Sequence, residues 1–170
     1  MSQYLVLTAM GADRTGCVSE LTNLASECEC NILDSRMAIF GKEFTFIMLL
    51  QGEAKAINQI ELRLPKVAVE LELITMMKRT SGYSTLENKQ HYLAEYTGID
   101  QPGLLKSITA FFAHRNIDIS SLKSDIDPAT NNMSASIQFT VNDDTGVESI
   151  ENDFLQLCEQ IDVQGCITKH

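Results

Sequence analysis

The chain has 170 residues, of which 44% are hydrophobic and 21% charged, a composition that is typical of globular proteins and argues against long disordered stretches. This length suits two domains of about 80 residues, each able to bury a modest core. The net charge of −10 argues against direct nucleic-acid binding, which depends on Lys and Arg displacing counterions from phosphates.

Membrane insertion and secretion are not expected either. No apolar run reaches the roughly 20 residues that span a bilayer. Residues 1–13 lack the basic region and the long apolar core of a secretory signal, so we place the protein in the cytoplasm. The cysteines number five, an odd count without metal-type spacing, and are expected to be reduced and buried.

The first half of the chain predicts six elements in the order strand, helix, strand, strand, helix, strand. Val18, Leu21, Ala25 and Cys28 follow helical spacing after a short apolar run. Pro65 is expected to end the second helix, because proline removes a backbone donor and crowds the preceding turn. The predicted ranges are a strand at 4–9, a helix around 18–28, strands at 32–40 and 44–51, a helix at 54–65 and a strand through 67–73.

A polar stretch from Lys78 to Gln90 separates the two halves of the chain. We predict a first domain over 1–79, a linker over 80–89 and a second domain over 90–170. Residues 1–80 carry eight basic and ten acidic residues, a net charge of −2, whereas residues 81–170 carry five and thirteen, a net charge of −8. The two domains are therefore expected to differ in surface.

The second half predicts the same six elements. Pro102 suits the first position of a helix, which Arg115-Asn116 should end. Met133 to Val141 alternates between apolar and polar residues, as a half-buried strand does. Turns are expected at 127–132 and 142–146, where Asp, Asn, Pro and Gly cluster. The predicted ranges are a strand at 91–96, a helix at 102–115, strands at 117–126 and 133–141, a helix through 147–161 and a strand at 162–169.

The two halves also repeat in sequence. Gly11-Ala12-Asp13-Arg14-Thr15-Gly16-Cys17-Val18 matches Gly98-Ile99-Asp100-Gln101-Pro102-Gly103-Leu104-Leu105 at an offset of 87 positions. At the same offset, Asn31-Ile32 falls on Asp118-Ile119. Two glycines and an aspartate at one spacing, followed by matching apolar positions, indicate an internal duplication.

The order of elements in each half predicts an α+β fold of two ferredoxin-like βαββαβ domains. Each antiparallel sheet should carry its helices on one face. A unit of this size that opens with Gly-x-Asp-x-[Pro/Thr]-Gly and continues to [Asn/Asp]-Ile resembles an ACT domain. The second copy carries the motif most clearly, whereas the first has Thr15 where the family usually has proline.

The resemblance implies regulation and not catalysis. A chain made of two ACT domains resembles a proteobacterial family of co-regulators of the glycine cleavage system, which implies an amino-acid ligand, with glycine favoured, and a DNA-binding transcription regulator protein as partner. It implies neither cofactor nor metal, and a homodimer is favoured. The alternative is a detached regulatory subunit of an amino-acid metabolic enzyme. A small enzyme on the same fold would need a titratable cluster, and the sequence has no recognisable catalytic motif.

Each glycine-rich turn leads into a helix start, whose free N–H groups attract a carboxylate. A nearby carboxylate or amide could hold the ammonium group of an amino acid, and the resemblance implies contact across a module interface. The alternative is that the aspartates cap helices and the glycines form turns. Arg14 could assist a ligand carboxylate or face solvent. The predicted ligand-binding residues are Gly11, Asp13, Gly16, Asn31, Gly98, Asp100, Gly103 and Asp118.

Overall fold

The computed structural model describes residues 2–81, 89–142 and 146–169, and the chain divides into two units, Met1–Ser84 and Thr85–His170. The N-terminal unit contains, in chain order, β1 (Gln3–Ala12), α1 (Cys17–Glu27), β2 (Asn31–Phe40), β3 (Glu43–Gly52), α2 (Ala54–Leu71) and β4 (Ile74–Thr80). The C-terminal unit contains β5 (Lys89–Ile99), α3 (Leu104–His114), β6 (Ile119–Ile126), β7 (Asn132–Asn142), α4 (Val147–Gln160) and β8 (Gln164–Lys169).

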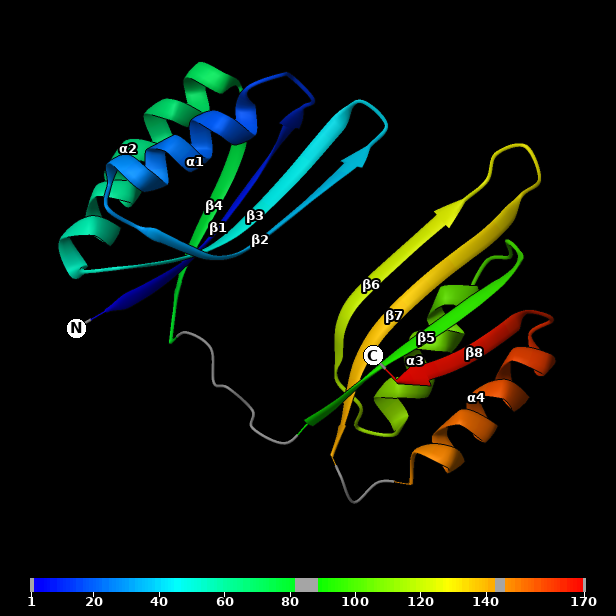
Figure 1. The fold of residues 1–170 in the computed structure, drawn as a ribbon. Coiled ribbons are helices and arrows are strands. Elements are labelled where there is room, and N and C mark those ends of the chain that lie inside the picture. The colour runs from blue at the N-terminus through cyan, green and yellow to red at the C-terminus, as the bar shows by residue number, and fades with distance from the viewer. Residues whose placement is uncertain (1, 82–88, 143–145, 170) are drawn as a thin grey trace. The chain divides into compact units, whose positions relative to one another are not determined.

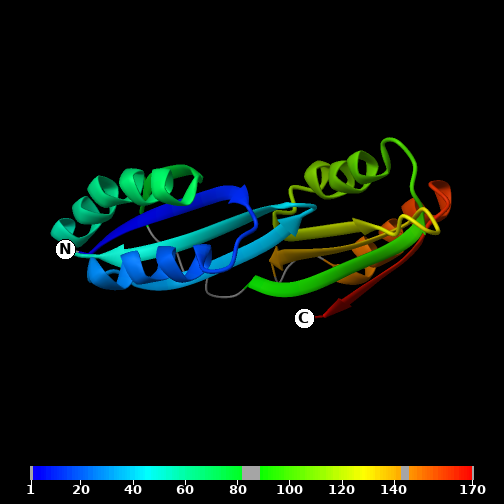
Figure 2. The same cartoon turned by 90° about the horizontal axis from the view of Figure 1, so that it is seen from above.

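Each unit is a four-stranded antiparallel sheet with two helices. The strand orders are β2-β3-β1-β4 and β6-β7-β5-β8, so the first strand of each copy is central and pairs with the third and fourth. Both helices of a unit pack on the same face of its sheet (Figure 1), and Figure 2 shows this layering in a view turned by 90°. The predicted fold class, two ferredoxin-like ACT-type domains, is confirmed.

Period-two alternation on the strands builds each core. On β7, the predicted alternation is confirmed: Ala135, Ile137, Phe139 and Val141 are buried and the polar residues between them lie on the other face. The aromatic rings of Phe112, Phe139 and Phe154 pack together beneath the helices of the C-terminal unit. The N-terminal core is built in the same way from Leu5, Leu7 and Ala9 of β1 with the buried residues of β3, α1 and α2.

Corresponding glycines occupy corresponding places in the two units. A Cβ atom at Gly11 would lie 2.7 Å from the Leu73 side chain, and one at Gly98 would lie 2.7 Å from the Val163 side chain. Leu73 and Val163 each follow a residue in the left-handed region at the end of the second helix, Glu72 or Asp162. The duplication seen in the sequence is therefore also a duplication of packing.

The structure corrects the prediction that α2 ends at Pro65. The helix continues to Leu71 with Pro65 inside it, and the last strand of the unit is Ile74–Thr80 instead of 67–73. An internal proline costs about 3 kcal/mol, but burying Leu64 and packing Val67 and Leu71 against the core outweighs this cost. The alternating Val67, Val69 and Leu71 misled the strand prediction, because Val69 is 78% exposed on the outer side of the helix.

One smaller expectation also changes. Pro102 does not open α3, because the helix begins at Leu104 with Gly103 as its N-cap. In the corrected last strand of the N-terminal unit, β4, Met76 is 67% exposed on the face of the sheet away from the helices. The expected helix end at Arg115-Asn116 is confirmed by the left-handed backbone of Asn116.

Parts of two predictions lie outside the described residues. The predicted linker at 80–89 falls mostly on 82–88, and the predicted turn at 142–146 falls on 143–145. On either side, β4 ends at Thr80 and β5 begins at Lys89. The predicted turn at 127–132 is described in full, and there the Asp127 carboxylate accepts hydrogen bonds from the Ala129 N–H and the Thr130 hydroxyl.

Replacing Gly98 with alanine should destabilise the C-terminal unit by about 1–3 kcal/mol, because the added methyl group would overlap Val163 on both its side chain and its backbone. Gly146→Ser is the matched control, since a Cβ atom there meets nothing within 4 Å and serine is favoured at a helix N-cap. Urea denaturation followed by circular dichroism measures both. Equal midpoints for wild type and Gly98→Ala would contradict the packing described above.

Candidate functional site

The β1–α1 and β5–α3 turns place a glycine at the start of each first helix. Gly16 and Gly103 are the N-cap residues, with φ of 98° and 92°. Residues other than glycine rarely adopt this backbone conformation. Neither helix receives a hydrogen bond from a capping side chain. Capping of these helices by hydrogen bonds from Asp13 and Asp100 is therefore wrong, whereas the expectation that the glycines form the turns is confirmed by the positive φ of Gly16 and Gly103.

The two aspartates instead anchor their turns through the backbone. The Asp13 N–H donates to the Lys42 carbonyl at 2.9 Å, and the Asp100 N–H donates to the Asn131 carbonyl at 2.9 Å. In each unit this bond joins the turn to the hairpin between the second and third strands. The turns are consequently fixed at one end of the sheet.

Within one unit, the structure does not bring all the predicted ligand-binding residues together. Asp118 lies beside Thr140, which pairs with His91, whereas Asp100 follows Ile99 at the other end of β5. His91 and Ile99 are eight residues apart on β5, which corresponds to about 26 Å along the strand. Asn31 and Asp13 are separated in the same way, at the levels of Tyr4 and Ala12 on β1.

Two cavities of the C-terminal unit border the glycine turn. One, of about 590 Å³, is lined by Gly98 and the start of β8, and the other, of about 470 Å³, lies between the start of α3 and the end of α4. Asp162 lines both cavities. The residues that line the second are Gln101, Pro102, Gly103, Leu104, Lys106, Ser107, Gln160, Ile161 and Asp162.

Sequence reasoning named Gly103 from this group but missed the α4 end. Gly98 and Gly103 border the cavities, whereas Asp100 and Asp118 are absent from their linings. The residues missed include Lys106, Ile161 and Asp162. The sequence contains a signal for Asp162, because the acidic-apolar pair Glu72-Leu73 of the first half recurs as Asp162-Val163 in the second. That match has an offset of 90 positions, so the repeat offset of 87 does not find it.

In the N-terminal unit, Arg14 occupies the corresponding position between helix start and helix end. Its guanidinium donates to the Leu71 carbonyl and lies 3.1 Å from the Glu72 carboxylate. Arg14 is therefore paired within its own unit and is not simply solvated. The two side chains are 45% and 79% exposed, so the pair adds little stability, as surface ion pairs usually do.

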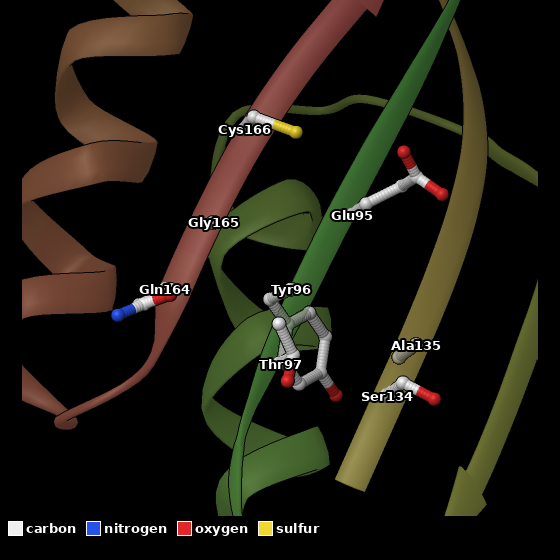
Figure 3. A pocket seen from close by; sticks show the side chains of 8 residues that line it. All are labelled: Glu95, Tyr96, Thr97, Ser134, Ala135, Gln164, Gly165 and Cys166. Atoms are coloured by element: carbon white, nitrogen blue, oxygen red, sulfur yellow. The ribbon is translucent and has the colours of Figure 1, made fainter.

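A third cavity, of about 390 Å³, opens on the face of the C-terminal sheet that the helices leave uncovered. Figure 3 shows the side chains of Glu95, Ser134 and Cys166 around it, on β5, β7 and β8. This face is polar, in contrast with the outer face of the N-terminal sheet, where Met10, Ile47, Ile74 and Met76 are exposed. The two sheets therefore present chemically different surfaces.

Tyr96 lies between this sheet and its helices and is 2% exposed. Among the described side chains, its hydroxyl is the buried polar atom without a hydrogen-bond partner. Burial raises the pKa of the Tyr96 phenol above its usual value, and charge on Cys158 and Asp100 adds to the rise. The phenol therefore stays protonated to a higher pH than an exposed tyrosine does.

The cysteines of both units are free, and Cys17, Cys28, Cys30 and Cys158 are buried. Burial raises the pKa of the Cys158 thiol to about 11, and burial also raises the pKa of Cys30. Thiols in such surroundings are poor nucleophiles at neutral pH. The expected burial is confirmed for these four cysteines, while Cys166 corrects the expectation because it is exposed.

In the part of the chain that the structure describes, no group of three or more His, Cys, Asp or Glu residues is placed to hold a metal ion. Among the same residues, no helix has both the length and the apolar character needed to cross a membrane.

Comparison with known proteins places the chain among regulators. The ACT domain family model matches residues 3–78. Over 168 residues the chain is 40% identical to the glycine cleavage system transcriptional repressor of Escherichia coli (strain K12), covering 96% of this chain and 88% of that protein. The chain belongs to this repressor family. The same identity and coverage hold for the repressor of Shigella flexneri.

Solved structures agree with this membership. A crystal structure assigned as a glycine cleavage system transcriptional repressor superposes with a TM-score of 0.78 at 36% identity, covering 100% of this chain and 99% of that chain. A protein of unknown function from Galdieria sulphuraria superposes with a TM-score of 0.82 at 20% identity, covering 100% of this chain and 99% of its own. The second match supports the fold alone.

Replacing Tyr96 with phenylalanine should stabilise the protein at neutral pH by about 1 kcal/mol, because it removes a buried hydroxyl that has no partner. Tyr92→Phe is the matched control: the Tyr92 hydroxyl donates to Gln90 at 2.7 Å, so its loss should cost roughly 0.5–1.5 kcal/mol. Urea midpoints at pH 7 compare the two variants.

The same variant tests the direction of the pKa shift. Folding raises the pKa of Tyr96, so the folded state holds the phenol proton more tightly than the unfolded state does. The resulting contribution to the free energy of unfolding is complete below the ordinary tyrosine pKa of about 10 and is lost as the pH rises above it. Wild type should therefore lose more stability between pH 9 and pH 11 than Tyr96→Phe does. Equal losses in the two proteins would contradict the raised pKa.

Proposed function

We propose that this chain is a non-enzymatic, glycine-responsive repressor of glycine cleavage genes that acts through a DNA-binding partner protein. The observation that carries the proposal is the 40% identity over 96% of the chain to the repressor of Escherichia coli. Because the similarity extends through both units, the regulatory role is transferred to the whole chain and not to one domain.

Charge supports action through a partner. The net charge is −10, and an acidic surface repels the phosphate backbone on which nucleic-acid affinity depends. The C-terminal unit contains most of this charge. Its exposed outer sheet face is polar, so it offers neither a basic groove nor an apolar wedge for DNA.

The ligand part of the proposal rests on the two glycine turns and the strand starts opposite them. Within one unit, the turn and the start of the second strand lie about 26 Å apart, as the strand register requires. A two-fold axis can pair opposite ends of two modules, so that the strand start of one lies beside the turn of the other. We therefore propose that Gly98–Gly103 and Asp118, or Gly11–Gly16 and Asn31, meet across a pair of modules in a homodimer.

The regulatory role predicts a defined outcome at the promoter of the host's glycine cleavage genes. Deleting the gene for this chain should raise expression of a reporter fused to that promoter, and restoring the gene should lower it again. The purified chain alone should leave the promoter DNA unshifted in a gel at about 0.15 M salt. An unchanged reporter would contradict repression, and a shift by the chain alone would contradict action through a partner.

Glycine sensing predicts a thermal shift. At about 100 times its dissociation constant, a ligand stabilises the folded protein by about 2.7 kcal/mol, which raises the unfolding midpoint of a domain of about 60–100 residues by roughly 11–22 °C. Calorimetry of the full chain with glycine, and with the other amino acids in turn, measures the shift. No shift with any amino acid at millimolar concentration would remove the sensing part of the proposal.

A further inference from the structure

The end of the second helix has the same backbone geometry in both units. In α2, the Leu73 N–H donates to the Ala68 carbonyl and Glu72 has a φ of 55°. In α4, the Val163 N–H donates to the Cys158 carbonyl and Asp162 has a φ of 57°. Leu71 and Ile161 therefore correspond, as do the carboxylates of Glu72 and Asp162.

In the N-terminal unit, these acceptors hold a cation. The Arg14 guanidinium binds both the Leu71 carbonyl and the Glu72 carboxylate. A helix C-terminus favours positive charge, because its last carbonyls have no partner within the helix. This end of the module is thus a cation site that the chain fills with its own side chain.

In the C-terminal unit, the same acceptors border an open cavity. Gln101 stands at the position of Arg14 and is too short and uncharged to replace it, and the cavity of about 470 Å³ lies between Gln101 and the α4 end. Asp162 forms no ion pair with any residue that the structure describes. The cation site is therefore retained while its internal cation is lost.

The cavity also gains a positive group on its other side. Lys106 of α3 lines it, and the corresponding residue of the N-terminal unit is Ser19. Within the described residues, Lys106 and Asp162 are not paired with each other. A small molecule that carries both an ammonium and a carboxylate group matches this arrangement.

We propose that this cavity binds a free α-amino acid, with the ammonium group held by the Ile161 carbonyl and the Asp162 carboxylate and the carboxylate group facing Lys106. This inference rests on the proposed function, because it locates the amino acid whose sensing is proposed there. For the same amino acid it is an alternative to the site between two modules proposed above, because it uses the end of α4 within one unit and needs no second module.

The test measures glycine binding to the full chain by isothermal titration calorimetry, with amide chemical shifts recorded in parallel. Gln101→Arg should abolish binding, because it supplies the guanidinium that Arg14 supplies in the other unit. Asp162→Asn should weaken binding by about tenfold or more, since it removes the charged acceptor, and asparagine tolerates the left-handed backbone. In wild type, glycine should shift the amide signals of Gly103 and Asp162.

The matched control comes from the N-terminal unit. Glu72→Asn changes the position that corresponds to Asp162 there and should leave glycine affinity within about twofold of wild type. Methylamine and acetate, each with half of the zwitterion, should bind much more weakly than glycine. Gln101→Arg should keep the unfolding midpoint of wild type or raise it, so a loss of binding will not reflect misfolding.

The outcomes separate the two proposals. If wild type binds glycine and both Gln101→Arg and Asp162→Asn bind it equally well, the cavity is not the site, while amino-acid sensing stands. If wild type binds another amino acid and not glycine, the same two variants decide on the site with that amino acid. If wild type binds no amino acid at all, both the site and the sensing part of the proposed function are overturned.

Discussion

In each unit, a glycine on the central strand packs against a residue just beyond the end of the second helix. Gly11 meets Leu73 and Gly98 meets Val163, at distances that leave no room for a Cβ atom. This contact holds the turn before the first helix beside the end of the second. The arrangement around the candidate site, with a helix start facing a helix end, depends on it, because any larger residue would push the two apart.

Duplication supplied two copies of this scaffold, and the copies then took on different surfaces. The first is nearly neutral overall, closes its helix-end acceptors with Arg14 and exposes apolar residues on its outer sheet face. The second is strongly acidic, leaves the same acceptors beside a cavity and has a polar outer face. Because the cores are built alike, these differences can change binding without changing the fold. The helix-end acceptors are thus paired within the first copy and border a cavity in the second.

Membership of the repressor family joins these features into one picture of regulation. A regulator that senses a small molecule needs a site whose occupancy changes the free energy of a module, and the end of α4 connects directly to β8 and so to the centre of the sheet. Helix ends and exposed turns are also the parts of a small domain that open at least cost. A ligand bound there would stabilise the connection between α4 and β8.

Much of this protein could be predicted from its sequence. The duplication, the six-element order of each half, the core-facing residues of β7 and the end of α3 at Arg115-Asn116 all follow from local periodicity and turn chemistry. The wrong boundaries arose where two local signals conflicted. Pro65 suggested a helix end, and only packing of the following turns against the core decided that the helix continues.

The candidate site depended on distances that a linear sequence does not contain. Asp100 and Asp118 lie close in the chain but at opposite ends of a sheet, because the helix between them carries the chain back along the strand. Asp162 lies far from Gln101 in the chain yet lines the same cavity. Sequence determines which residues alternate and where turns form, since these are properties of neighbouring residues. Tertiary structure alone decides which turn faces which helix end, because that follows from how the core closes.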